Sequence, residues 1–506
     1  MASKLFKGDM PELTEIILSN LNNEFYSLYS CSLVNRHLCQ MSIPILWQDP
    51  FSFNKTPKFI SRYLSSLEDD EISILYKCGI NIEFPQTLFH YARFIKVLDF
   101  PRLVEKVGQW SNLRNNNKSQ RRITDDISNL LTKLFIKSGA TLIKLHVLVS
   151  RFIGRPIIFT LGRNEHFFSR LQDVSVEIES EGSYFIEGIR LLKILTTTTS
   201  KIHTLQFKIG EINDCYKQQV YYLFVNIIRS QQQLRRFNLI YDIELEMKLN
   251  GIIPALECQR NSLQEIKISN CDYNLSLEKL IKSKNLEVFR MSYCEEYRLL
   301  KPLINNHCKI STLEIISFDL YESVVNQLAQ YLKKSGALLQ RLKLDSEEGI
   351  ESQTSLLEAL MTCSNLSYLY ISPIIFSAQV PKFIEKLQKL QFFTLKWYYE
   401  ETEDEQSSLV MQTAKALPTT LQYLEWDSFQ SDSYINDLIS HCEAPLKKLI
   451  IGESYNRDKT KEELIKFCLR KQTLKYINTS CPDLNLKKGL EGYVEMVPYD
   501  QIVVNC

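Results

Sequence analysis

Cysteine and histidine are the side chains of this 506-residue chain with the widest range of chemistry, as nucleophiles, metal ligands and proton carriers. Thirteen cysteines and seven histidines are present, but none forms C-x-x-C or a cysteine–histidine group with zinc-site spacing. The sequence also lacks a glycine-rich phosphate loop and a G-x-S-x-G nucleophile motif. We therefore expect no catalytic activity, no metal site and no cofactor.

Cations and aromatic rings at regularly spaced positions offer a different chemistry, the recognition of a protein surface. Arginine and aromatic side chains dominate the binding energy of protein interfaces. The alternative is that the tyrosines are ordinary strand residues covered by a neighbouring loop. The predicted partner-binding residues are Arg290, Arg341, Lys343, Tyr368, Tyr370, Phe392 and Tyr423.

A repeated sequence pattern positions these side chains. Its clearest copy, residues 263–271, matches the leucine-rich-repeat signature L-x-x-L-x-L-x-x-N/C. The first, fourth and sixth places point into a core, and the third, fifth and seventh point outward. The pattern recurs with a mean spacing of about 28 residues, which lies in the leucine-rich-repeat range. Its starts are Leu142, Leu171, Ile202, Leu234, Leu263, Leu286, Ile310, Leu339, Leu366, Leu390, Leu421, Leu446 and Leu474.

The segments between these starts have helical spacing, so the pattern predicts a strand and a helix in each repeat. Such units stack into a curved α/β solenoid with its strands inside the curve. We expect the solenoid over residues 95–480, a helical linker or N-terminal cap over 52–94, and a C-terminal cap over 481–506. Several cysteines fall at the ninth place or just before a strand, where a buried thiol packs as a small hydrophobe. They are Cys271, Cys294, Cys308, Cys363 and Cys442.

The overall charge argues against a general nucleic-acid binder. Sixty basic and fifty-nine acidic residues give a net charge of +1, whereas such binders carry a basic excess. Arg121 and Arg122, in a polar loop over 111–122, are weak evidence for nucleic-acid binding or localisation. The acidic stretch 400–405 either contacts a basic partner or is a solvated loop. With no apolar run of membrane-spanning length, we expect no membrane contact, reduced thiols, and a cytoplasmic and/or nuclear protein.

Residues 5–51 have a pattern of their own. Asp9 is a predicted helix cap, with Pro11 in the first turn of the helix that follows. A second helical stretch covers 26–41; Pro44 is expected to break it, and Trp47 then supplies an apolar anchor. Periodicity alone also allows a small helical cap on the solenoid.

The residues of this segment resemble an F-box. The match consists of the opening Met10-Pro11-Glu12-Leu13, the segment Val34-Asn35-Arg36, and Pro44-Ile45-Leu46-Trp47. It departs from the family at Met10, where leucine is usual, and at His37-Leu38, where a large aromatic residue often follows the arginine. The resemblance implies a three-helix module that docks on a Skp-type adaptor and, through it, on a cullin. Its implied adaptor-binding residues, not yet divided between the adaptor face and the module's core, are Pro11, Leu13, Ile16, Leu28, Val34 and Leu38.

Together, the module and the repeats resemble the F-box/leucine-rich-repeat family along nearly the whole chain. The resemblance implies a substrate-recognition subunit of a Skp–cullin–F-box ubiquitin ligase, whose solenoid binds a target protein for ubiquitination. The alternative is a leucine-rich-repeat scaffold or adaptor that acts without degradation. The sequence does not identify the target.

Overall fold

A computed structural model describes residues 11–505 except 23, 54–55, 81–85, 113–119, 150–154, 179–183, 211–213, 242–250, 271–282, 295–302, 305–308, 399–402, 429–432, 453–456 and 480–483. Asp9, Met10, Cys271, Cys308 and parts of the stretches 111–122 and 400–405 lie outside the described residues. Contacts divide the chain into two units, residues 1–243 and 244–506. This division falls inside the predicted solenoid.

Three helices open the first unit: α2 (Pro11–Ser19), α3 (Phe25–Ser32) and α4 (Arg36–Leu46). The Asn35 side chain accepts a hydrogen bond of 2.8 Å from the Leu38 amide and so caps α4. The prediction that Pro44 breaks the helix is wrong, because Pro44 lies inside α4. A proline in the last turn removes only one hydrogen bond from the helix.

Short elements connect these three helices to the first strand. The Trp47 ring stacks on Tyr91 at 4.0 Å between centroids and meets Tyr63 edge-on at 5.2 Å, so it is the apolar anchor that the sequence predicted. The connecting elements are η1 (Pro50–Ser52), η2 (Pro57–Phe59), α5 (Ile60–Leu64), α6 (Asp69–Lys77) and η3 (Tyr91–Phe94).

The rest of the first unit alternates strands with helices, and neighbouring strands pair in parallel. Its strands are β1 (Val97–Asp99), β2 (Lys144–Val149), β3 (Asp173–Ile178), β4 (Thr204–Ile209) and β5 (Arg236–Tyr241). Its helices are α7 (Phe100–Asn112), α8 (Gln120–Lys137), α9 (Arg155–Gly162), η4 (Glu165–Phe168), α10 (Tyr184–Thr198) and α11 (Asp214–Ser230).

The second unit continues the alternation. Its strands are β6 (Glu265–Ser269), β7 (Val288–Ser292), β8 (Thr312–Ser317), β9 (Arg341–Ser346), β10 (Tyr368–Ile375), β11 (Phe392–Tyr398), β12 (Tyr423–Ser428), β13 (Lys448–Ile451), β14 (Tyr476–Thr479) and β15 (Glu495–Met496). Its helices are α12 (Ile252–Glu257), α15 (Glu322–Ser335), η6 (Gly336–Leu338), α16 (Gln353–Leu360), α17 (Gln379–Lys386), α18 (Glu403–Ala416), α19 (Ser433–His441), α20 (Arg457–Lys471), α21 (Leu484–Leu490) and α22 (Tyr499–Ile502).

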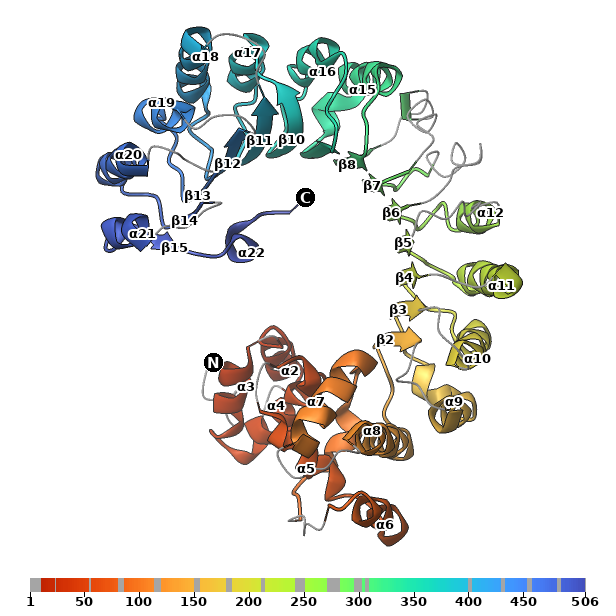
Figure 1. Ribbon diagram of the computed structural model, residues 1–506. Coiled ribbons are helices and arrows are strands. Elements are labelled where there is room, and N and C mark those ends of the chain that lie inside the picture. The colour runs from red at the N-terminus through yellow and green to blue at the C-terminus, as the bar shows by residue number, and fades with distance from the viewer. Residues whose placement is uncertain are drawn as a thin grey trace. The chain divides into compact units, whose positions relative to one another are not determined.

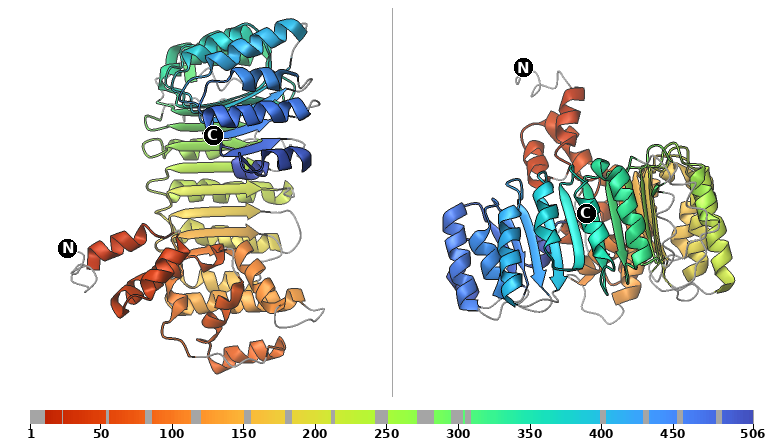
Figure 2. Two further views of the ribbon diagram at one scale, coloured as in Figure 1. Left: turned by 90° about the vertical axis from the view of Figure 1, so that its left-hand side faces the viewer. Right: turned by 90° about the horizontal axis from the view of Figure 1, so that it is seen from above.

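Within the second unit, the strands β8–β15 lie on the inner side of an arc, and α15–α21 lie on its outer side (Figure 1). Neighbouring strands lie side by side and run in the same direction (Figure 2). Parallel strands require a crossover connection, and a helix is the usual one. The chain therefore folds as an α/β solenoid, as the repeat spacing predicts.

The burial of the strands confirms the predicted core positions of the repeat, whereas the seventh place, predicted to point outward, is buried at Ser269 and Ser292. All thirteen predicted starts are buried, and each of the strands β2–β14 begins two places after one of them. In β6, Ile266 and Ile268 are buried at the fourth and sixth places, while Glu265 and Lys267 remain partly exposed. Each buried leucine or isoleucine contributes roughly 1.5–3 kcal/mol, so the stacked repeats hold one another in place.

None of the helices in the described part of the chain combines the length and apolar character that a membrane crossing requires.

Candidate protein-binding surfaces

Two rows of side chains cross the inner face of the second unit. Because the strands are paired in register, residues at the same repeat position lie next to each other on neighbouring strands. The third-position row contains Arg341, Tyr368, Phe392, Tyr423 and Lys448 on β9–β13. The fifth-position row contains Glu314, Lys343, Tyr370, Thr394, Glu425 and Ile450 on β8–β13.

Cations and rings of these rows contact one another. The Arg341 guanidinium lies 4.6 Å from the centre of the Tyr368 ring, and the Lys343 ammonium lies 4.7 Å from that of Tyr370. Such cation–π contacts stabilise a partly exposed pair by about 0.5–1 kcal/mol. The structure therefore brings the predicted cations and aromatic residues of β9 and β10 together on one surface.

The chain's own residues 497–505, here called the C-terminal segment, lie on this surface. Figure 1 shows α22 and the chain end on the inner side of the strands. The Arg341 guanidinium donates to the Asn505 carbonyl at 2.7 Å, and the Tyr368 hydroxyl donates to the Val504 carbonyl at 3.1 Å. These two bonds fix the main chain of the segment across β9 and β10.

Further hydrogen bonds hold the earlier part of the C-terminal segment. Lys448 donates from Nζ to the Ile502 carbonyl at 3.4 Å. Asn478 on β14 donates from Nδ2 to the Val497 carbonyl at 2.8 Å. Side chains of four strands thus donate to main-chain carbonyls of the segment.

An apolar cluster completes the contact. Ile502 is fully buried against Tyr423 and Ile450, with Phe392 packed against the cluster. Tyr423 is 1% exposed and Tyr368 is 2% exposed, so the expectation that these two side chains are exposed is wrong. The cover comes from a segment far along the chain.

A buried carboxylate lies beneath the C-terminal segment. Thr394 and Tyr423 donate their hydroxyls to Glu425 Oε2 at 3.0 and 2.9 Å, and Tyr499 of the segment donates to Oε1 at 3.1 Å. Lys396 Nζ lies 3.8 Å from the same Oε1. Burial first, and then the Glu425 charge, raise the pKa of Tyr423 and Tyr499 well above the ordinary tyrosine value. Both hydroxyls therefore stay protonated and donate to the carboxylate.

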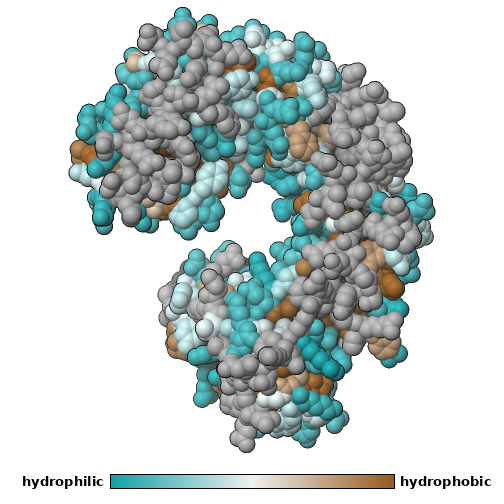
Figure 3. Space-filling view, in the orientation of Figure 1, coloured by the Kyte–Doolittle hydropathy of each residue, from teal (hydrophilic) through white to brown (hydrophobic). Residues whose placement is uncertain are grey.

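Arg290 is neutralised by side chains of its own sheet. Its Nη1 lies 2.6 Å from Glu265 Oε1 and its Nε lies 3.2 Å from Glu314 Oε2, on the strands to either side. It was predicted to bind a partner, but breaking these two ion pairs opposes that role. Figure 3 shows mainly hydrophilic residues along the inner side of the second unit, in accord with such paired charges.

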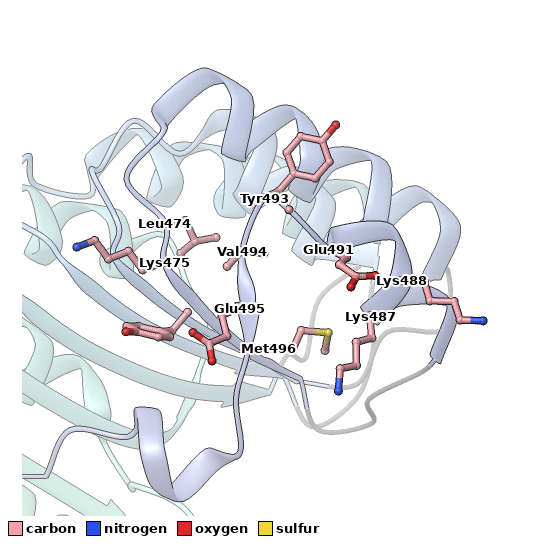
Figure 4. A pocket seen from close by; sticks show the side chains of 11 residues that line it. Leu474, Lys475, Lys487, Lys488, Glu491, Tyr493, Val494, Glu495 and Met496 are labelled. Atoms are coloured by element: carbon pink, nitrogen blue, oxygen red, sulfur yellow. The ribbon is translucent and has the colours of Figure 1, made fainter.

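Two hollows lie near the C-terminal segment. One, of about 390 Å³, is lined by Lys396, Glu425, Asp427 and Tyr499 among others. The second is an open depression of about 890 Å³ between β14, α21 and β15. In Figure 4 the Lys475 and Lys488 side chains around it point to opposite sides, so its charges do not converge on a ligand.

His146 on β2 joins three strands of the first unit. Its Nδ1 lies 3.1 Å from Asp99 on β1, and its Nε2 lies 3.0 Å from Glu177 on β3. The hydrogen bond to Asp99 raises the pKa of His146 and Glu177 adds to the shift, although partial burial acts in the opposite direction. The imidazolium of His146 therefore lies between two carboxylates and is hydrogen-bonded to both.

Replacing His146 by asparagine is expected to remove a pH dependence of stability. Because the folded-state pKa of His146 is raised, its stabilisation is complete below the ordinary value of about 6.5 and is lost as the pH rises through the raised value. The loss is about 1.5–3 kcal/mol, the scale of one hydrogen bond to a charged group. Hydrogen exchange of residues 144–149 between about pH 6 and 8.5 measures it. Equal pH slopes for the native chain and the variant would contradict the prediction.

The structure divides the residues implied to bind the adaptor. Leu28 and Leu38 are buried with Leu18 in the core of the three-helix module, so they stabilise the module and offer no surface to an adaptor. In contrast, Ile16 is 60% exposed and Val34 is 59% exposed. Leu13, at 40%, is exposed as well, while Pro11 is the first residue of α2.

The predicted packing cysteines that the structure describes are buried, whereas Cys258 is exposed. Cys294, Cys363 and Cys442 are buried and free of disulfides. Burial raises the pKa of the Cys363 thiol to about 12 and that of Cys442 to about 11, so both remain protonated and unreactive. Within the described ranges, no group of three or more His, Cys, Asp or Glu side chains is arranged to hold a metal ion.

No protein-family model matches this chain, and no curated protein matches its sequence. Solved structures with similar architecture include the leucine-rich repeat-containing protein LegL7 from Legionella pneumophila (11% identity, 60% of this chain and 99% of that one, TM-score 0.36). A leucine-rich-repeat protein of Leptospira interrogans is 12% identical over 80% of this chain and 95% of that one, with a TM-score of 0.30. A Bacteroides fragilis protein is 11% identical over 65% and 74%, with a TM-score of 0.27. At these values the similarities assign neither a family nor a function to the chain.

Proposed function

We propose that this chain is the substrate-recognition subunit of a Skp–cullin–F-box ubiquitin ligase. Its three-helix module, α2–α4, docks on the Skp-type adaptor, and its solenoid binds a target protein. The observation that carries the proposal is the set of aliphatic side chains that the module leaves exposed outside its own core. The exposed set is Leu13, Ile16, Ile17, Leu33 and Val34.

Burying the exposed aliphatic residues in an interface would contribute enough free energy to hold a partner. Burying one such side chain contributes roughly 1.5–3 kcal/mol, so covering several of them offsets the cost of association. They come from α2 and from the turn that precedes α4, and an apolar helix face is one of the recurring means of recognition between proteins. The Asn35 cap holds Val34 at the start of α4, which supports the resemblance of Val34-Asn35-Arg36 to the F-box segment.

The experiment is a pull-down of a purified Skp-type adaptor with the full chain and with the double variant Ile16→Asp, Val34→Asp. We expect the variant to lose at least about 100-fold in affinity, which corresponds to about 2.7 kcal/mol, because it places two charges in an apolar contact. Leu469→Asp is the matched control, since Leu469 is an exposed leucine on α20 of the second unit.

Unchanged recovery of the adaptor by the double variant would contradict the proposal that the three-helix module docks on the adaptor. Circular dichroism of the variant distinguishes lost docking from an unfolded module, because both substituted side chains are exposed and the core formed by Leu18, Leu28 and Leu38 is untouched. The alternative function, a scaffold that acts without degradation, predicts that a reconstituted ligase transfers no ubiquitin to the protein captured by the solenoid.

A further inference from the structure

The inner surface of β9–β13 recognises a peptide main chain. Arg341, Tyr368 and Lys448 each donate to a carbonyl of the C-terminal segment, at residues 505, 504 and 502. Main-chain carbonyls are present in every peptide, so these three donors do not select a sequence by themselves. They do require a segment that makes one helical turn at α22 (Tyr499–Ile502) and then continues across the strands.

Three side chains of the C-terminal segment add sequence selectivity. Tyr499 donates to the buried Glu425 carboxylate at 3.1 Å. Ile502 fills the pocket beside Tyr423 and Ile450, and Val504 packs against the same cluster. Together they define a recognised pattern, Tyr-x-x-Ile-x-Val, in which the hydroxyl and the two aliphatic side chains face the surface.

The contacts of the C-terminal segment suit a segment that can exchange with a competitor. Its hydrogen bonds to Tyr368, Lys448, Asn478 and Glu425 are only part-buried, and the one from Arg341 is exposed. A bond between neutral groups contributes about 0.5–1.5 kcal/mol net, and one that involves Arg341, Lys448 or Glu425 contributes about 1.5–3 kcal/mol. Because the segment is tethered, its effective concentration is on the order of millimolar, so a free peptide competes poorly until the segment is released.

We propose that this surface is the docking site for a peptide of a partner protein that carries the pattern Tyr-x-x-Ile-x-Val, with one helical turn over Tyr-x-x-Ile as in α22, and that the C-terminal segment occupies the site as an internal competitor. The inference deepens the target capture of the proposed function and is independent of adaptor docking. In this site Arg341, Tyr368 and Lys448 donate to the main chain of the peptide. Glu425 accepts from the tyrosine hydroxyl of the peptide, and the Tyr423–Ile450 cluster packs against its aliphatic side chains.

The test measures binding of a fluorescein-labelled peptide with the sequence of residues 495–505 by fluorescence anisotropy. The Ile502→Asp variant of the full chain, whose segment is released, is expected to bind the peptide at least tenfold more tightly than the native chain. Adding Arg341→Ala to Ile502→Asp is expected to cost at least tenfold. The matched control is Arg236→Ala, because Arg236 occupies the third position of β5 in the first unit. A peptide with aspartate in place of the isoleucine corresponding to Ile502 is expected not to bind.

Faster hydrogen exchange of residues 497–505 in Ile502→Asp establishes that the segment is released. If these residues stay protected, Val504→Asp is added to the variant, and its peptide affinity is compared with that of the native chain in the same way. Equal peptide affinity of the released variant and the native chain overturns the inference. Loss of the second unit's melting transition in the variant also overturns it, because the segment would then be needed for folding. A dimer of the native chain that the peptide dissociates would assign the site to a second copy and overturn it too. Adaptor binding is expected to be unchanged by Ile502→Asp, which separates this test from that of docking.

Discussion

Replacing Trp397 by alanine is expected to destabilise the second unit by about 3–5 kcal/mol, the range for a buried aromatic residue. Trp397 is fully buried on β11, and its ring lies 4.5 Å from that of Phe376, 5.7 Å from that of Trp426 and 5.8 Å from that of Tyr434. These rings come from β11, β12, helix α19 and the residue that follows β10, so the substitution leaves a cavity that no single element can close.

Urea unfolding followed by hydrogen exchange measures this loss, with residues 392–398 reporting on β11. The matched control is Tyr493→Ala, since Tyr493 is a largely exposed aromatic residue of the same unit, and we expect a change within about 0.5 kcal/mol. In a stack of repeats each unit contacts its neighbours, so the loss should be concentrated near β10–β12. A loss below about 1 kcal/mol would mean that the aromatic cluster does not support these repeats.

Replacing Glu425 by alanine is expected to cost about 3 kcal/mol and to release the C-terminal segment. The substitution leaves the hydroxyls of Thr394 and Tyr423 without their acceptor beneath the segment and removes the anchor of Tyr499. A hydrogen bond to a charged group is worth about 1.5–3 kcal/mol, and a buried donor left without an acceptor adds its desolvation cost. Glu425→Gln keeps the shape and one acceptor oxygen, so we expect a smaller loss of about 1–2 kcal/mol.

Faster hydrogen exchange of residues 497–505 measures the release, and chemical denaturation measures the loss of stability. Glu443→Ala is the matched control, because Glu443 is an exposed glutamate paired with Lys471 in the same unit, and exposed pairs contribute little. If the segment exchanges at the same rate in Glu425→Ala and in the native chain, Tyr499 does not anchor it.

The repeat register could be predicted because it depends on local spacing. Leu263, Ile266 and Ile268 alternate with polar residues, and the alternation alone determines which side chains enter the core. The same rule holds where the spacing between repeats varies, because each strand supplies its own pattern. The structure confirms these assignments in β2–β14.

The cover over the third-position row could not be predicted in the same way. Tyr368 and Tyr423 occupy outward positions in their strands, which the alternation rule marks as exposed. The residues that bury them lie far along the chain, as in the hydrogen bond from Tyr368 to a carbonyl 136 residues away. The sequence predicts a C-terminal cap over 481–506, but a cap at the end of the solenoid does not indicate that residues 497–505 cover the inner face of β9–β13.

In the three-helix module, the sequence could not separate the residues of the core from those of the exposed surface. Leu28, Leu38, Ile16 and Val34 are all aliphatic residues at helical spacing, and their types do not say which of two apolar faces each belongs to. Only the packing of α2, α3 and α4 separates the core pair, Leu28 and Leu38, from the exposed pair. Whether the exposed pair contacts an adaptor stays a prediction.

The hydrogen bond between Arg341 and the Asn505 carbonyl spans 164 residues, and this separation has a consequence during synthesis of the chain. Ribosomes add about 5–20 residues per second, so roughly 3–11 s pass between the synthesis of β13, which completes the surface of β9–β13, and that of residue 505. Repeats that depend on their neighbours can stack during this interval. If the surface docks a partner peptide as proposed, each newly made molecule passes through a period in which the surface is formed but the C-terminal segment does not yet cover it.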